Sequence, residues 1–150
     1  MTKIIEEFKE RVLWRFTIGT LDDEIREKWE PGAPTIKSRL QSLEELYANY
    51  WKTSVSIEPF LGKDLLDLID RIDSYITDTI WIGPMNKIHV PKELWTQELT
   101  DLYSPKNLYS LKQEIDNLNN PKIRYKDHFL SIALKYIPES KEYQEILVYH

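Results

Sequence analysis

Three short segments of this chain alternate between polar and apolar residues, and each follows a stretch with helical periodicity: residues 15–20, 53–59 and 79–86. Strands that alternate with helices over such distances are typical of parallel βα units. Parallel strands covered on both faces instead read as near-continuous apolar runs. Here polar residues occupy every second position, at Arg15, Thr17, Ser54, Ser56 and Glu58. We therefore expect an α/β fold whose sheet turns one polar face toward a cavity.

The same order of strands and helices continues along the chain. The patterns predict strands over residues 13–19, 52–59, 79–86 and 123–127. They predict helices over residues 3–10, 20–29, 64–75, 91–102, 104–118 and 129–137, with one more that begins at Thr35. Three helix starts carry capping signals, namely Thr20 with Asp23, Thr35, and Ser104 with Pro105. The expected architecture is about four mostly parallel strands with flanking helices in a single domain.

Composition excludes several kinds of function. The 150 residues suffice for one domain with a real core, and the net charge of −5 argues against nucleic acid binding through a basic surface. The absence of cysteine excludes a thiolate nucleophile and thiolate-held clusters in this chain. No apolar run approaches the ~20 residues that span a bilayer, and the amino terminus lacks a signal-peptide core. We expect a cytoplasmic protein that binds no membrane.

Glu58 is the strongest single candidate for a functional side chain. It precedes a proline near the carboxyl end of a predicted strand, where ligands bind in open α/β sheets and barrels. There it can accept hydrogen bonds from an amine or a ribose, or act as a base. The alternative is an ion pair with Arg15 that fills the interior. Both interpretations stay open at this point.

The other candidates are weaker, and each has a structural alternative. The hydroxyls of Thr17 and Ser56 suit a ligand on the same face, but backbone groups often satisfy such hydroxyls. Gly19, Gly83 and Pro84 permit close backbone approach, while Trp81 and Met85 are interpreted as packing residues. Arg124 and Lys126 suit a carboxylate or phosphate, or they protect an edge strand from aggregation. The three histidines show no metal-ligand spacing, and no nucleotide-binding or protease motif is present.

Four strings in this order resemble radical S-adenosylmethionine (SAM) proteins, in the branch of spore photoproduct lyase and DNA repair photolyase-like proteins. They are Arg15–Glu24 followed by Trp29–Pro34, then Lys52–Leu61, Trp81–Lys87 and Pro121–Asp127. The resemblance covers roughly residues 7–136. It implies the carboxyl-terminal half of a partial (βα)6 barrel over those residues, followed by an extra helical tail over 137–150.

The resemblance also implies a ligand and its contacts. Thr17 or Thr20 takes the place of a polar contact to the SAM ribose. Glu58, with Ser56, lies beside the adenosine, and the backbone from Gly83 to Met85 borders the adenine. SAM is thus the implied cofactor, and the implied SAM-binding residues are Thr17, Thr20, Ser56, Glu58, Gly83 and Met85.

One departure from the family is large. The family's amino-terminal half holds a 4Fe-4S cluster on a CxxxCxxC loop, and this chain has no cysteine. It therefore cannot run radical SAM chemistry alone. We expect a truncated or split radical SAM-like protein that forms a homo-oligomer or pairs with a separate cysteine-bearing half, since a half-barrel exposes sheet edges. The alternatives are a non-catalytic binding or regulatory module, a self-associating half-barrel of unknown function, and a relic without specific function.

Overall fold

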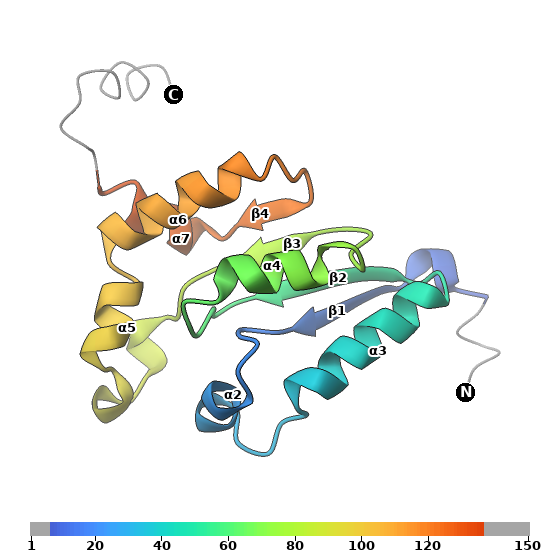
Figure 1. The fold of residues 1–150 in the computed structure, drawn as a ribbon, viewed down its shortest axis with the longest axis horizontal. Helices are drawn as coiled ribbons and strands as arrows, with labels where there is room; N and C mark the ends of the chain where they lie inside the picture. Colours follow the sequence, from blue (N-terminus) through green and yellow to red (C-terminus); the bar gives the residue numbers. More distant parts are fainter. Residues whose placement is uncertain (1–6, 137–150) are drawn as a thin grey trace.

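A four-stranded parallel sheet forms the centre of the computed structural model, which describes residues 7–136 (Figure 1). The strands follow chain order across the sheet, as β1 (Leu13–Thr17), β2 (Lys52–Ile57), β3 (Ile80–Ile82) and β4 (Ile123–Tyr125). Every neighbouring pair is parallel. The expected α/β fold with about four parallel strands is confirmed.

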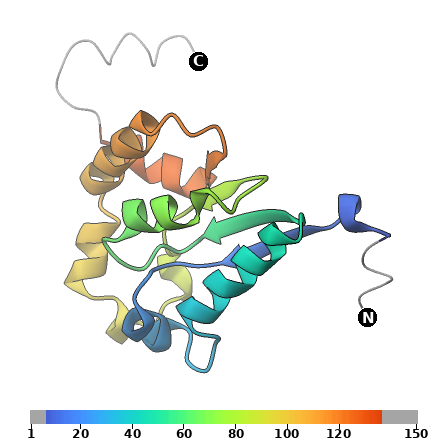
Figure 2. The same ribbon diagram turned by 45° about the vertical axis from the view of Figure 1, so that its right-hand side comes forward.

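The helices that connect the strands lie on one side of the sheet. The main ones are α3 (Ile36–Ala48), α4 (Leu65–Asp73) and α6 (Pro105–Asn117), which lie together on the same side in Figures 1 and 2. Right-handed crossovers between strands taken in sequential order place successive helices on one face. The shorter elements are η1 (Lys9–Arg11), α2 (Asp23–Trp29), η2 (Lys87–His89), η3 (Lys92–Leu94), α5 (Gln97–Leu102) and α7 (Asp127–Ala133).

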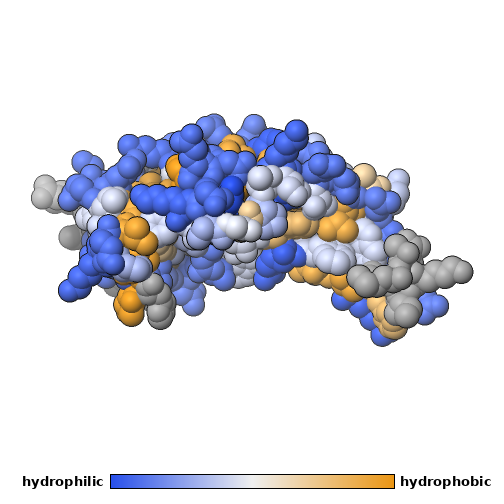
Figure 3. Space-filling view, turned by 90° about the horizontal axis from the view of Figure 1, so that it is seen from below, coloured by the Kyte–Doolittle hydropathy of each residue, from blue (hydrophilic) through white to orange (hydrophobic). Residues whose placement is uncertain are grey.

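The core fills the space between this helical layer and the sheet. From the strands it takes the alternate apolar residues, including Val55, Ile57, Ile80 and Ile82, all fully buried. From α4 it takes the apolar face predicted from the sequence, namely Leu65, Leu68, Ile69 and Ile72. Burial of one such side chain stabilises the fold by about 1.5–3 kcal/mol. The face of the molecule shown in Figure 3 is mostly polar, with separate apolar patches.

Two of the three predicted helix caps are confirmed. The hydroxyl of Thr35 accepts a hydrogen bond from the amide of Ser38 at 3.2 Å and begins α3. The hydroxyl of Ser104 accepts one from the amide of Asn107 at 3.3 Å, with Pro105 in the first turn of α6. Each cap satisfies an amide that the helix itself leaves unpaired.

The predicted cap at Thr20 is wrong. Asp22 caps α2, and its carboxylate accepts from the two amides of Glu24 and Ile25. The hydroxyl of Thr20 instead donates to the carboxylate of Asp64, 44 positions along the chain, at 2.8 Å. The same hydroxyl accepts from the amide of Asp22 at 3.1 Å, before α2 begins, so Thr20 orders the loop and does not cap the helix.

The segment after β3 also differs from the prediction. In place of one helix over residues 91–102, it forms η3 and then the short helix α5. The cause lies at Thr96, whose hydroxyl accepts from the amide of Leu99 at 3.3 Å and starts a new helix there. The predicted strand over 79–86 is also shorter, because β3 ends before Gly83. Residues 3–6 of the first predicted helix and the tail over 137–150 lie outside the described residues.

Candidate functional site

The sheet face opposite α3, α4 and α6 is polar, and we call it the polar face. It comprises Arg15, Thr17, Ser54, Ser56, Glu58, Trp81, Gly83, Arg124 and Lys126. The register aligns one row across all four strands, namely Thr17, Ser56, Trp81 and Arg124. Because side chains alternate along a strand, these residues point away from the apolar core. The alternation predicted from the sequence is therefore a property of the folded sheet.

Two hydroxyls on this face have no partner of their own. Within the described residues, neither the Thr17 nor the Ser56 side chain makes a hydrogen bond, and Thr17 is exposed. Ser54 differs, since it is fully buried, donates to the carbonyl of Thr79 at 2.8 Å and accepts from Arg15 at 3.2 Å. The alternative that backbone groups satisfy Thr17 and Ser56 is thus wrong. Both hydroxyls are available to a ligand.

Glu58 forms an ion pair, but its partner is not Arg15. The ammonium of Lys126 lies 2.9 Å from the Glu58 carboxylate. Arg15 lies in register with Ser54, four residues before Glu58 on β2, which corresponds to about 13 Å along a strand. The alternative of an ion pair between Glu58 and Arg15 is therefore wrong.

Gly83 makes the Glu58–Lys126 pair possible. The two charged residues follow β2 and β4, and β3 lies between those strands. A Cβ atom at Gly83 would lie 3.0 Å from the Cγ atoms of both Glu58 and Lys126. The groups that approach Gly83 closely are therefore the side chains of Glu58 and Lys126, which pass over it.

Trp81 belongs to the polar face rather than to the core. The Lys126 ammonium lies 5.1 Å from the centroid of its indole ring, within the range of a cation–π interaction. The indole Nε1 is buried and has no hydrogen-bond partner among the described residues. The sequence predicts a packing role for Trp81, but the residue lies on the polar face. The alternation itself carried the signal, since Trp81 occupies the polar register of β3.

A cavity of about 410 Å³ opens at the carboxyl ends of the strands. Its wall includes two of the predicted residues, Thr17 and Met85. Gly19 also lines it, and the rest of the wall comes from residues that were not predicted as site residues, including Trp29 of α2, Glu30, Val90 and Leu94 of η3. Volumes of this size are typical of sites for small ligands, which combine apolar walls with a few polar groups.

Gly19 shapes the same edge of the sheet. Its carbonyl accepts a hydrogen bond from the amide of Leu61 at 2.8 Å. A Cβ atom at Gly19 would lie only 2.4 Å from the carbonyl oxygen of Pro59. The loop after β2 therefore packs directly on the backbone after β1, as predicted for this glycine. The peptide bond between Glu58 and Pro59 in this loop is cis.

Two arginines hold the turn over residues 30–34 beside this cavity. Arg39 donates to the carbonyl of Thr17 at 2.8 Å and to that of Pro34 at 3.1 Å, and it pairs with Glu30. Arg26, which is buried, donates to the carbonyl of Ala33 at 3.1 Å. These contacts fix the turn against the end of β1.

Asp23 connects this turn to α3. The amide of Ile36 donates to its carboxylate at 3.0 Å, and Arg26 pairs with the same oxygen at 3.0 Å. The backbone hydrogen bond from Ile36, followed by the Arg26 contact, lowers the pKa of Asp23 below its ordinary value.

Thr20 lies away from the polar face. It is fully buried, and the carboxylate oxygen that accepts from its hydroxyl also accepts from the amide of Leu21 at 2.6 Å. The structure thus groups five of the six predicted SAM-binding residues at one edge of the sheet. Thr17 and Met85 line the cavity. Ser56, Glu58 and Gly83 lie on the polar face. The sixth residue, Thr20, is bonded to Asp64 in the loop before α4.

Tyr103, which ends α5, contacts the loop after β2. It is buried, donates to the carbonyl of Phe60 and packs edge-on against the Phe60 ring at 5.1 Å between centroids. Burial raises the pKa of its phenol far above the ordinary value. The phenol stays protonated at neutral pH and acts as a structural donor.

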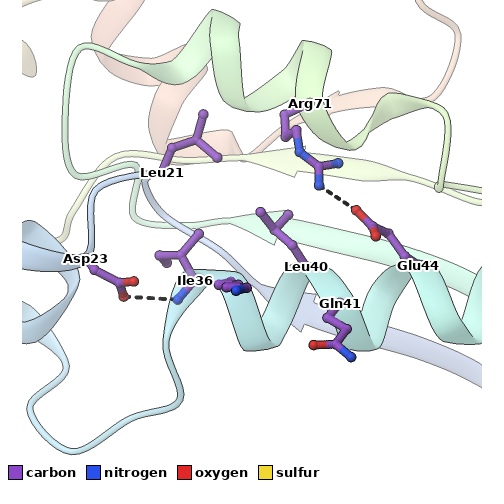
Figure 4. A pocket seen from close by; sticks show the side chains of 8 residues that line it. Leu21, Asp23, Ile36, Leu40, Gln41, Glu44 and Arg71 are labelled. Carbon is purple, nitrogen blue, oxygen red and sulfur yellow. Dashed lines mark hydrogen bonds and ion pairs between the residues drawn. The ribbon is translucent and has the colours of Figure 1, made fainter.

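A second cavity, of about 480 Å³, lies between α3 and α4 on the helical side (Figure 4). Three of its four charged residues already have partners, since Arg71 pairs with Glu44 and Asp23 accepts from Ile36, while the fourth, Lys37, is exposed. The free hydroxyls described above are all on the other side of the sheet. The polar face with its adjoining cavity is therefore the better candidate site.

Comparisons with models of protein families, with curated proteins and with solved structures found no match. Within residues 7–136, no cluster of three or more histidine, aspartate or glutamate side chains is arranged to hold a metal ion. None of the helices in this part of the chain is long and apolar enough to span a bilayer.

Proposed function

We propose that this chain supplies one wall of a barrel-type site for an adenosyl ligand, with SAM as the first candidate, and that it does not catalyse radical SAM chemistry by itself. The observation that carries the proposal is the polar face, on which Thr17 lines a cavity of about 410 Å³ at the carboxyl ends of parallel strands and Ser56 lies in register beside it on β2. Parallel α/β sheets bind their ligands at this edge.

The groups on the polar face match those of SAM in kind. The hydroxyls of Thr17 and Ser56 suit the ribose, and Glu58 suits an amine or a hydroxyl. The flat indole of Trp81 and the side chain of Met85 suit an aromatic base. When bound, SAM supplies a sulfonium that can be cleaved, and this chain's residues would bind and orient the molecule.

An iron–sulfur cluster does not fit this chain. Such clusters are held mainly by cysteine thiolates, and the sequence contains none. We therefore assign no reaction step to the chain. In the split-protein form of the proposal, a separate cysteine-bearing chain supplies the cluster.

The edge at β1 suits an association with that chain or with a second copy. Leu13 and Trp14 of this edge strand keep more than a third of their surface exposed. Exposed strand edges with apolar side chains favour pairing with another strand. The partner would close the polar face from the opposite side.

Calorimetry with SAM and S-adenosylhomocysteine tests the proposal. We expect binding by the wild-type chain and a loss of affinity of about threefold to tenfold for Thr17→Val and for Ser56→Ala. Ser74→Ala serves as the control, since Ser74 ends α4 and is exposed. Equal affinity in all three variants would contradict a site on the polar face.

Light scattering after size-exclusion chromatography separates the two forms of the proposal. A homo-oligomer supports the form in which the half-barrel associates with another chain. A stable monomer that binds SAM alone supports the alternative of a non-catalytic binding or regulatory module.

A further inference from the structure

The ion pair between Glu58 and Lys126 lies on the polar face, directly after the carboxyl ends of β2 and β4. Both side chains remain more than a third exposed, at 37% for Glu58 and 38% for Lys126. An ion pair exposed to this extent is held weakly, because water and salt compete for both charges. Either charge can therefore exchange its partner for a ligand group.

Positive charge exceeds negative charge on this face. Of the nine residues that define it, Arg15, Arg124 and Lys126 are cations and only Glu58 is an acid. Arg15 donates to a serine hydroxyl, and Arg124 donates to the carbonyls of Pro121 and Ile123 at 2.7 Å. Neither guanidinium meets a carboxylate in the described part of the chain. This excess occurs in a chain whose net charge is −5.

The surroundings of Lys126 favour a ligand that carries an anion next to a ring. Its ammonium lies over the Trp81 indole, and the lack of a side chain at Gly83 lets the Glu58 and Lys126 side chains meet over β3. Arg124 precedes Lys126 by two residues on the same face, which corresponds to about 7 Å along a strand.

We propose that Lys126 is an anion subsite that Glu58 occupies in the absence of ligand. A carboxylate or phosphate of the ligand takes the place of Glu58 on Lys126. The released Glu58 carboxylate then accepts hydrogen bonds from an amine or hydroxyl of the same ligand. This inference rests on the proposed adenosyl site for the rest of the ligand, and it adds that the ligand is anionic at the end near β4.

A ligand series separates the anion from the adenosyl group. Adenosine carries no anion, S-adenosylhomocysteine carries a carboxylate, adenosine 5′-monophosphate carries a phosphate, and inorganic phosphate carries no adenosyl group. Calorimetry at constant ionic strength would measure all four against wild type, Glu58→Gln and Lys126→Gln. The control variants are Lys112→Gln and Asp116→Asn, because Lys112 also pairs with a carboxylate, at 2.6 Å, and lies over a ring, at 5.2 Å.

We expect Lys126→Gln to weaken the three anionic probes by about tenfold and Glu58→Gln to strengthen inorganic phosphate by about threefold or more. Adenosine, which has no anion to compete with Glu58, should not bind Glu58→Gln more tightly. The two control variants should match wild type. Thermal melting establishes that each variant is folded. If Lys126→Gln does not fold, Lys126→Arg takes its place as the test variant. It keeps the charge and should retain most of the affinity for the anionic probes.

The outcomes distinguish this inference from the proposed function. Inorganic phosphate binding that depends on Lys126, without binding of any adenosyl compound, would support the anion subsite and contradict the adenosyl site. Equal effects of Lys126→Gln on adenosine and on the anionic probes would overturn the subsite while leaving the adenosyl site in place. Failure of every probe to bind both wild type and Glu58→Gln would overturn both.

Discussion

Replacement of Gly19 by alanine tests the geometry that forms the edge of the candidate site. The new Cβ atom would lie 2.4 Å from the carbonyl oxygen of Pro59 and 3.1 Å from Cγ of Leu61. Close carbon–oxygen contacts in proteins are about 3.3 Å or longer, so the backbone must separate by roughly 0.9 Å. A flexible side chain cannot relieve this contact, because the obstructing atom belongs to the main chain.

The expected cost has two sources. Overpacking of this kind destabilises a protein by about 1–3 kcal/mol. Separation of the two segments also weakens the 2.8 Å hydrogen bond from Leu61 to the Gly19 carbonyl, which contributes about 1 kcal/mol. We therefore expect Gly19→Ala to lower the free energy of unfolding by about 2–4 kcal/mol.

Urea denaturation followed by circular dichroism measures this free energy, with an unchanged slope as evidence that the same surface unfolds. Gly32→Ala is the matched control. Its Cβ would meet no atom within 4 Å, but its φ of +77° is unfavourable for alanine at about 1–2 kcal/mol. A loss at Gly19 below about 0.5 kcal/mol would refute the close approach, since that is the usual range for surface changes.

Further predictions concern the caps, the core and acid stability. Thr35→Ala and Ser104→Ala should each cost about 1 kcal/mol in urea denaturation, and a neutral effect at either position would exclude its capping role. Ile57→Ala should cost about 2–5 kcal/mol, whereas Ile88→Ala, at a side chain 86% exposed, should be nearly neutral; similar values would contradict the assigned core. Because folding lowers the pKa of Asp23, its contribution to stability is fully present above the unfolded value near 3.8 and declines as pH falls through the lower folded value. The free energies of unfolding of wild type and Asp23→Asn, measured as a function of pH, should therefore converge at low pH. A difference that stays constant over the whole pH range would contradict the Asp23 contacts.

Local patterns in the sequence predict much of this fold. The alternation at Arg15 and Thr17, and at Ser54, Ser56 and Glu58, identified the polar face because a strand presents alternate residues to opposite sides. The capping signals at Thr35 and Ser104 are equally local, since each hydroxyl reaches an amide three residues ahead. Features of this kind depend on neighbours in the chain.

Errors arose where a partner lies far along the chain. The hydroxyl of Thr20 bonds to Asp64, and Glu58 pairs with Lys126, 68 positions away. The second contact depends on the register of two strand pairs and on a glycine between them. The cavity residues Pro91 and Leu94 were missed because residues 91–102 read as one regular helix. The division of this segment into η3 and α5 follows from the Thr96 cap, which was not predicted from the sequence.

The Trp81 indole signal in nuclear magnetic resonance tests the central claim most directly. The chain has five tryptophans, and the indole signal that disappears in Trp81→Phe belongs to the polar face. On titration with S-adenosylhomocysteine, a ligand on this face should shift the Trp81 signal strongly, because its Nε1 is buried there without a partner among the described residues. The Trp14 and Trp51 signals, which come from the opposite end of the strands, should change little. A ligand-induced shift at those residues with Trp81 unchanged would contradict the assignment of the site.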